Sequence, residues 1–131
     1  MKVFVVEDQP VELKLAVHVL TAAGHEVGRA TAAEGALQAI LENQPDVILL
    51  DMALPGMNGL ALARALKNDP RTQGIPIVAV TSYPEHFSEA EASAAGCNAY
   101  ISKPLSTRTL PHVLAELVVN PNTDPDDDPD R

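Results

Sequence analysis

Five short runs of strand character alternate with longer helical segments along the chain. The runs are KVFVV (2–6), HEVGRA (25–30), DVILL (46–50), IPIVAV (75–80) and NAYIS (98–102). In the third run, four consecutive apolar residues leave no polar face, which is typical of a strand buried on both sides in a parallel sheet. Five strand–helix units in this order predict an α/β fold, with a doubly wound, five-stranded parallel sheet and helices on both of its faces.

The intervening segments carry the signals of helix starts and ends. We expect helices over 9–24, 31–44, 58–69 and 84–96, and a fifth helix that ends near Val119. Pro10 suits the start of the first helix, and Thr31 could cap the second. Pro111 cannot donate a helical hydrogen bond, so the fifth helix is expected to begin near Thr107 or Thr109.

The end of the chain differs in composition from the rest. Residues 120–131 (NPNTDPDDDPDR) hold five Asp and one Arg. A segment this acidic and proline-rich cannot bury enough apolar surface to offset its ordering entropy, and we expect it to be disordered. Residues 1–119 fit a single domain with one core of ordinary size.

Charge and apolar pattern exclude two classes of partner. The formal net charge is −9, whereas nucleic-acid binding needs a basic surface. No apolar run approaches the roughly 20 residues of a membrane span, and the N-terminus lacks a signal-peptide pattern. Cys97 has no second cysteine to pair with, and we expect it to be a small buried hydrophobe in a protein of the cytoplasm.

Polar and charged residues stand where the predicted strands end. They are Glu7 and Asp8 after the first strand, Asp51 after the third, Thr81 and Ser82 after the fourth, and Lys103 after the fifth. In an open α/β sheet, ligands bind in the crevice outside the carboxyl ends of the strands. Each residue alone has an ordinary structural explanation, such as a helix cap or a surface charge. Together they predict a functional site at this edge of the sheet.

Three carboxylates, a hydroxyl and an ammonium group suit phosphoryl transfer. Crowded carboxylates repel one another, and a hard cation such as Mg²⁺ relieves the repulsion through oxygen ligands. The cation and Lys103 can then neutralise the oxygens of a transferred phosphoryl group, and Thr81 can hydrogen-bond one of them. Asp51 is the candidate nucleophile and would form an aspartyl phosphate.

This ordered set of residues resembles the receiver domains of bacterial two-component response regulators. The resemblance covers residues 1 to about 119 and is carried by Glu7-Asp8, by Asp51 in DMALPGMNG, by Thr81 in VAVTS and by Lys103-Pro104 in AYISKP. It implies a flavodoxin-like sheet of order 2-1-3-4-5. It also implies that Asp51 takes a phosphoryl group from a histidine kinase or a histidine phosphotransfer protein.

The resemblance also implies a metal site. Asp8 and Asp51 would bind Mg²⁺ directly, Glu7 would bind it through water, and the backbone carbonyl of Ala53 would supply another ligand. Lys103 would pair with the phosphate.

The output of such a protein would come from a switch. Thr81 and Tyr100 would form it, and they would remodel the face made by the fourth helix, the fifth strand and the fifth helix. No output domain follows the last helix in the sequence, so we expect a single-domain regulator. It would control partner proteins or pass the phosphoryl group on in a phosphorelay, and it could pair as a homodimer.

Two alternatives stay open. A phosphohydrolase on a similar sheet would also form an aspartyl phosphate, but such enzymes usually carry a second acid two residues after the nucleophile, where this chain has Ala53. An adaptor of the same fold would work without phosphorylation. We expect a phosphoacceptor signalling protein rather than an enzyme, with chemistry limited to its own phosphorylation and dephosphorylation.

Overall fold

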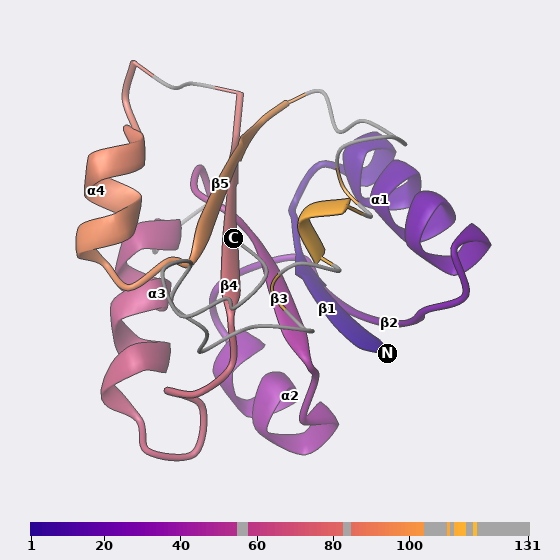
Figure 1. Ribbon diagram of the computed structural model, residues 1–131, viewed down its shortest axis with the longest axis horizontal. Coiled ribbons are helices and arrows are strands. Elements are labelled where there is room, and N and C mark those ends of the chain that lie inside the picture. The colour runs from indigo at the N-terminus through magenta and orange to yellow at the C-terminus, as the bar shows by residue number, and fades with distance from the viewer. Residues whose placement is uncertain (55–57, 83–84, 104–109, 111, 115–116, 118–131) are drawn as a thin grey trace, which may run out of the picture.

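The computed structural model of the protein describes residues 1–54, 58–82, 85–103, 110, 112–114 and 117 (Figure 1). Strands and helices alternate along the chain, as the sequence predicts. The elements are β1 (Lys2–Val6), α1 (Pro10–Ala22), β2 (Glu26–Ala30), α2 (Ala36–Asn43), β3 (Val47–Asp51), α3 (Gly59–Asn68), β4 (Ile77–Thr81), α4 (Glu89–Ala94) and β5 (Ala99–Ser102). Residues 110, 112–114 and 117 are also helical and belong to the predicted fifth helix.

The strands form one parallel sheet in the order β2-β1-β3-β4-β5, which confirms the predicted topology. The chain builds outward from β1 in one direction to β2 and then in the other direction from β3 to β5. Such a reversal opens a crevice at the carboxyl ends of the two strands that flank it. Val6 at the end of β1 lies opposite Leu50 of β3, so the residues that follow both strands reach this crevice.

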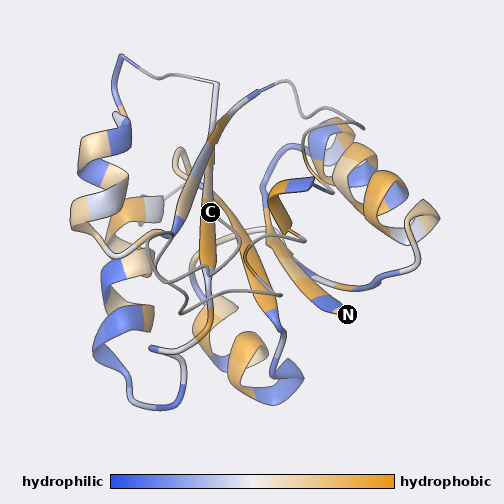
Figure 2. Ribbon diagram, in the orientation of Figure 1, coloured by the Kyte–Doolittle hydropathy of each residue, from blue (hydrophilic) through white to orange (hydrophobic). Residues whose placement is uncertain are grey.

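Both faces of the central strands are buried. Alternate residues of a strand point to opposite faces of the sheet. Phe4 and Ile48 pack with residues of α2, α3 and α4, whereas Val5 and Leu49 pack with α1 and with Leu110. Figure 1 shows α1 across the sheet from the other labelled helices, and Figure 2 shows the apolar strands between them. The two cores hold the strand ends in fixed positions.

Two helices begin later than the sequence predicted. The predicted cap at Thr31 is wrong, because α2 starts at Ala36 after Gly35, whose φ of 82° lies in the left-handed region that glycine adopts readily. α4 starts after Ser88, which forms a capping box with Glu91. The loops before both helices are correspondingly longer than expected.

Two predictions fall outside the described residues. They concern the start of the fifth helix near Thr107 or Thr109, and the acidic segment 120–131. The division into a receiver domain over 1–119 and a disordered tail therefore stays a prediction.

Among the residues that the structure describes, none forms a helix long and apolar enough to cross a bilayer.

Candidate functional site

Four strand ends bring the predicted site residues to one edge of the sheet. Asp51 and Thr81 are the last residues of β3 and β4, Glu7 follows β1, and Lys103 follows β5. Lys103 N donates a hydrogen bond to the Thr81 carbonyl (2.8 Å), which holds the end of β5 beside β4. Asp51 and Glu7 are buried, with 4% and 5% of their surface exposed. Buried carboxylates are unfavourable without partners, so their neighbours decide what they can do.

The backbone around Asp51 fixes the direction of its carboxylate. Ala53 N donates to Asp51 Oδ1 (3.0 Å), and Met52 N donates to Val80 O (2.9 Å), which continues the pairing of β3 with β4. Gly59 packs against this turn, because a Cβ at Gly59 would lie 2.4 Å from Asp51 O and 2.6 Å from Met52 Cα. The absence of a side chain at Gly59 therefore allows α3 to begin directly beside Asp51.

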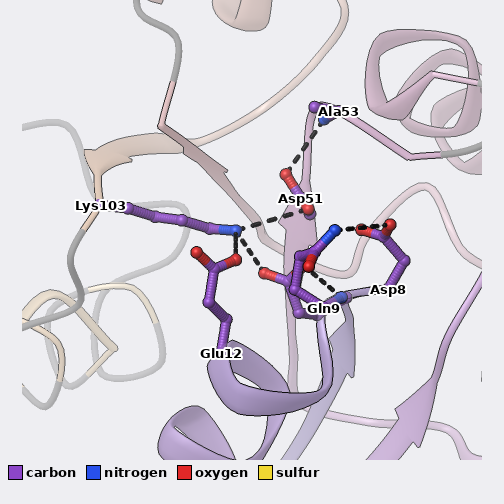
Figure 3. Close-up of polar contacts among 7 residues, drawn as sticks. Asp8, Gln9, Glu12, Asp51, Ala53 and Lys103 are labelled. Carbon is purple, nitrogen blue, oxygen red and sulfur yellow. Dashed lines mark hydrogen bonds and ion pairs between the residues drawn. The ribbon is translucent and has the colours of Figure 1, made fainter.

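Lys103 supplies the positive charge of the site. Its Nζ lies 2.5 Å from Glu7 Oε1 and 3.5 Å from Asp51 Oδ2, and it also contacts Glu12 Oε2. The Lys103 side chain is 8% exposed, whereas that of Glu12 is 38% exposed. Figure 3 shows the ammonium group between the carboxylates of Asp51 and Glu12. One buried cation is thus shared among three acids.

Burial and neighbouring charges shift the pKa values of Glu7 and Lys103. Burial raises the pKa of Glu7 to about 8, helped by Asp51 and opposed by Lys103. Burial lowers the pKa of Lys103, but hydrogen bonds to Glu12 and Glu7 and the charge of Asp51 outweigh that effect, so its pKa lies above the ordinary value. The carboxylates outnumber the ammonium group, and further positive charge would stabilise them.

Glu7, Asp8 and Asp51 can together bind a metal ion. One carboxylate oxygen from each lies within 4.8 Å of the other two. Asp8 Oδ1 is buried and accepts no hydrogen bond from the described part of the chain, an unfavourable state that a bound cation would relieve. Ligands that are all oxygen suit a hard divalent cation. The donor set fits such an ion.

A cavity of about 430 Å³ lies over these groups. Its lining residues are Asp8, Gln9, Glu12, Asp51, Ala53, Ser82 and Lys103. The carboxylate of Asp51 is therefore buried by the protein around it and still reachable from the cavity.

The two predicted switch residues lie on β4 and β5, and Thr81 is at the strand end next to that of Asp51. Thr81 is fully buried at the end of β4, and its neighbour Ser82 lines the cavity. Tyr100 of β5 lies on the α4 side, where its hydroxyl donates to Phe87 O (2.6 Å). A second cavity, of about 360 Å³, is lined by Tyr100 and by α4 residues that include Glu89. The Tyr100 ring thus borders open space beside α4.

Two residues of the site, Glu12 and Gln9, were not predicted from the sequence. Gln9 N donates to Glu7 Oε2 (3.2 Å), and the Gln9 side chain donates to Asp8 Oδ2 (3.3 Å). Glu12 lies in the first turn of α1, which begins at Pro10 directly after the acidic pair. The signal was present, since a helix that starts this soon after a strand places its first turn near that strand's end.

Comparisons of the sequence with known proteins agree with this geometry. The family model for the response regulator receiver domain matches residues 3–115. The polar-differentiation response regulator DivK of Brucella ovis is 38% identical over 104 residues, which cover 79% of this chain and 85% of DivK.

Solved structures share the fold. The CheY-like response regulator receiver domain protein of Methanospirillum hungatei is 27% identical, with a TM-score of 0.83 over 91% of this chain and 94% of that one. The receiver domain of the sensor histidine kinase PA1611 of Pseudomonas aeruginosa, solved with magnesium in its active-site cleft, is 24% identical, with a TM-score of 0.83 over 90% and 97%. Family model, sequence identity and fold together show that this chain belongs to the response regulator receiver domain family.

Proposed function

We propose that Asp51 is the phosphoacceptor of this response regulator and that the donor is the phosphohistidine of a histidine kinase or a histidine phosphotransfer protein. The position of Asp51 carries the proposal. Its carboxylate is buried at the end of β3, lies 3.5 Å from the Lys103 ammonium group and faces a cavity. A nucleophilic carboxylate beside a fixed cation is what phosphoryl transfer needs.

In the transfer step, an Asp51 carboxylate oxygen would attack the phosphorus. The new O–P bond forms as the N–P bond to the donor histidine breaks. The departing imidazole nitrogen keeps the bonding electrons, and a proton on the other ring nitrogen leaves the ring neutral. The hydrogen bond from Ala53 N to Asp51 Oδ1 orients the attacking carboxylate. Lys103 would move to an oxygen of the phosphoryl group.

Mg²⁺ is the cation that we propose for the acidic cluster. Asp8 and Asp51 would bind it directly, Glu7 would bind it through water, and the Ala53 carbonyl would add a further oxygen. When bound, the ion supplies positive charge for the phosphoryl oxygens. The close approach of the three carboxylates and the buried Asp8 Oδ1 support this assignment.

We propose that Thr81 and Tyr100 transmit the signal to the face of α4, β5 and the fifth helix. A partner protein would read that face, or the phosphoryl group would pass to a further histidine in a relay. The cavity between Tyr100 and α4 supports this route, because it leaves room for the ring to move. Pairing of two copies as a homodimer and a cytoplasmic location stay predictions.

The phosphohydrolase and adaptor alternatives are not favoured. The receiver domain family consists of signalling proteins. The residue two positions after Asp51 is Ala53, whose side chain cannot act as the general acid or base of a phosphohydrolase. An absence of enzymatic activity beyond self-phosphorylation and dephosphorylation is part of the proposal.

The test is phosphorylation by acetyl phosphate and Mg²⁺, followed by the mass of the intact protein. We expect one phosphoryl group on the wild type and none on Asp51→Asn. The matched control is Asp46→Asn, since Asp46 is an exposed acid beside the opposite end of β3 and should not affect labelling. Full labelling of Asp51→Asn would refute the assignment. An unlabelled wild type would favour the adaptor, and turnover of phosphomonoesters would favour the phosphohydrolase.

A further inference from the structure

We propose that Glu12 is a positioning residue for the phosphoryl-transfer reaction, which holds Lys103 in the resting protein and must release it when Asp51 is phosphorylated. This inference rests on the proposed function of Asp51. It adds a control on the rate of that reaction, located in the first turn of α1.

The contacts of Lys103 show where its charge is held. Lys103 Nζ is within hydrogen-bond distance of Glu7 and Glu12. Asp51 Oδ2 is 3.5 Å away, beyond the usual 2.7–3.2 Å of an N–H···O hydrogen bond. The Lys103 ammonium group is therefore held close to Asp51, but its short hydrogen bonds are to Glu7 and Glu12.

Glu12 stands outside the group of acids that fits a metal ion. Among the described residues that group consists of Glu7, Asp8 and Asp51. Glu12 instead lines the cavity from α1, with 38% of its side chain exposed, and contacts Lys103 across 91 positions of sequence. Its charged partner in the described structure is Lys103, so its effect on the reaction would act through Lys103.

The charges give the expected direction of that effect. A phosphoryl group on Asp51 brings new anionic oxygens that need the Lys103 ammonium group, and Glu12 competes with them for it. Removing the charge of Glu12 should therefore speed phosphorylation.

The experiment compares Glu12→Gln with a matched control, Glu34→Gln. Glu34 is an exposed acid in the loop after β2 and does not contact Lys103. The initial rate of phosphorylation by acetyl phosphate is measured at saturating Mg²⁺. We expect Glu12→Gln to react about three- to fivefold faster than Glu34→Gln, as the loss of a half-exposed ion pair would allow. When Lys103 is also replaced by Met, Glu12→Gln and Glu34→Gln should be phosphorylated at similar rates, because the effect of Glu12 acts through Lys103.

A second readout needs neither phosphate nor metal. NMR of the Lys103 ammonium group in the metal-free protein should show greater mobility in Glu12→Gln and no change in Glu34→Gln. A purely structural role for Glu12 would alter thermal stability without this local change at Lys103.

The outcomes separate the inference from the function on which it rests. An unlabelled wild type would overturn both. A labelled wild type with equal rates in Glu12→Gln and Glu34→Gln, or with Glu12→Gln slower, would overturn the role of Glu12 alone. If Glu12→Gln lowered the folded fraction, the NMR readout would decide, and an unchanged Lys103 ammonium group in the folded molecules would overturn the proposal.

Discussion

At the scale of single residues, partial burial lowers the reactivity of Cys97, which the sequence predicted to be buried and which is half-buried at the wall of the second cavity. Burial raises the pKa of the Cys97 thiol to about 11, and the charge of Lys67 opposes this only in part. The thiolate is the reactive form, and a free cysteine has a pKa of about 8.5, so at pH 8 the thiolate fraction of folded Cys97 is roughly two hundredfold lower. A thiolate of higher pKa is also the stronger nucleophile, so we expect folded Cys97 to react with iodoacetamide roughly twenty times more slowly than a free cysteine. The measurement is the rate of mass increase during alkylation.

The control for Cys97 is the same chain unfolded in urea, which should react at the free rate. The raised pKa also makes stability depend on pH. The folded state binds the thiol proton more tightly than the unfolded state, so this contribution is fully present below about pH 8.5 and is lost as the pH rises toward 11. Equal alkylation rates in the folded and unfolded chain would contradict the raised pKa of the half-buried Cys97 thiol.

Single residues also show how far the site could be predicted from the sequence. Asp51 and Lys103 could be placed because the carboxyl ends of parallel strands meet at one edge, whatever the details of packing. The contact of Lys103 with Glu12 could not be predicted, because it depends on the angle of α1 to the sheet and on the rotamer of a long side chain. Neither property leaves a periodic signal in the sequence.

At the scale of elements, the junction of β3 and α3 depends on Gly59. A Cβ there would meet backbone atoms of Asp51 and Met52 that cannot move aside. We expect Gly59→Ala to destabilise the fold by about 1–3 kcal/mol, the usual effect of overpacking. Because the clash is with the backbone of Asp51 itself, phosphorylation by acetyl phosphate should also slow. Thermal melting and labelling rates measure the two effects.

The matched control for Gly59 is Gly74→Ala. A Cβ at Gly74 meets nothing within 4 Å, so this change should leave melting and labelling close to wild type. An equally stable Gly59→Ala, labelled at the wild-type rate, would show that α3 can shift away from Asp51 without loss.

The helix boundaries show which element-level signals could be read from the sequence. The start of α4 was readable, since Ser88 and Glu91 have the spacing of a capping box, but the residues before Ser88 resemble a helix in composition. The start of α2 was not readable, because Gly35 acts through a positive φ that depends on the path of the loop. The central strands β1, β3 and β4 were located within about two residues because burial on both faces leaves continuous apolar runs.

At the scale of the whole molecule, β4 and β5 connect the proposed phosphorylation site at Asp51 to the α4 face. Thr81 is paired with Ser102 and Ala79 with Tyr100, so the strand end beside Asp51 and the Tyr100 ring belong to one rigid ladder. Tyr100 packs against the core shared by α2, α3 and α4, and its hydroxyl is held by Phe87 O. A displacement at the end of β4 can therefore be transmitted to Tyr100 through the hydrogen-bonded backbone of β4 and β5.

That coupling could run through Thr81 or through its neighbour Ser82, and substitutions at the two positions distinguish the routes. A phosphoryl group shifts the protein between two states only by its different interactions with each. Thr81 is fully buried against the β4–β5 pair, whereas Ser82 lines the cavity over Asp51. We therefore expect Thr81→Ala to bind the phosphoryl mimic beryllofluoride at Asp51 but to lose most of the NMR response at Tyr100, and Ser82→Ala to keep that response. The opposite pattern would place the switch at the cavity wall, and an unchanged response in both variants would show that Tyr100 senses Asp51 by another route.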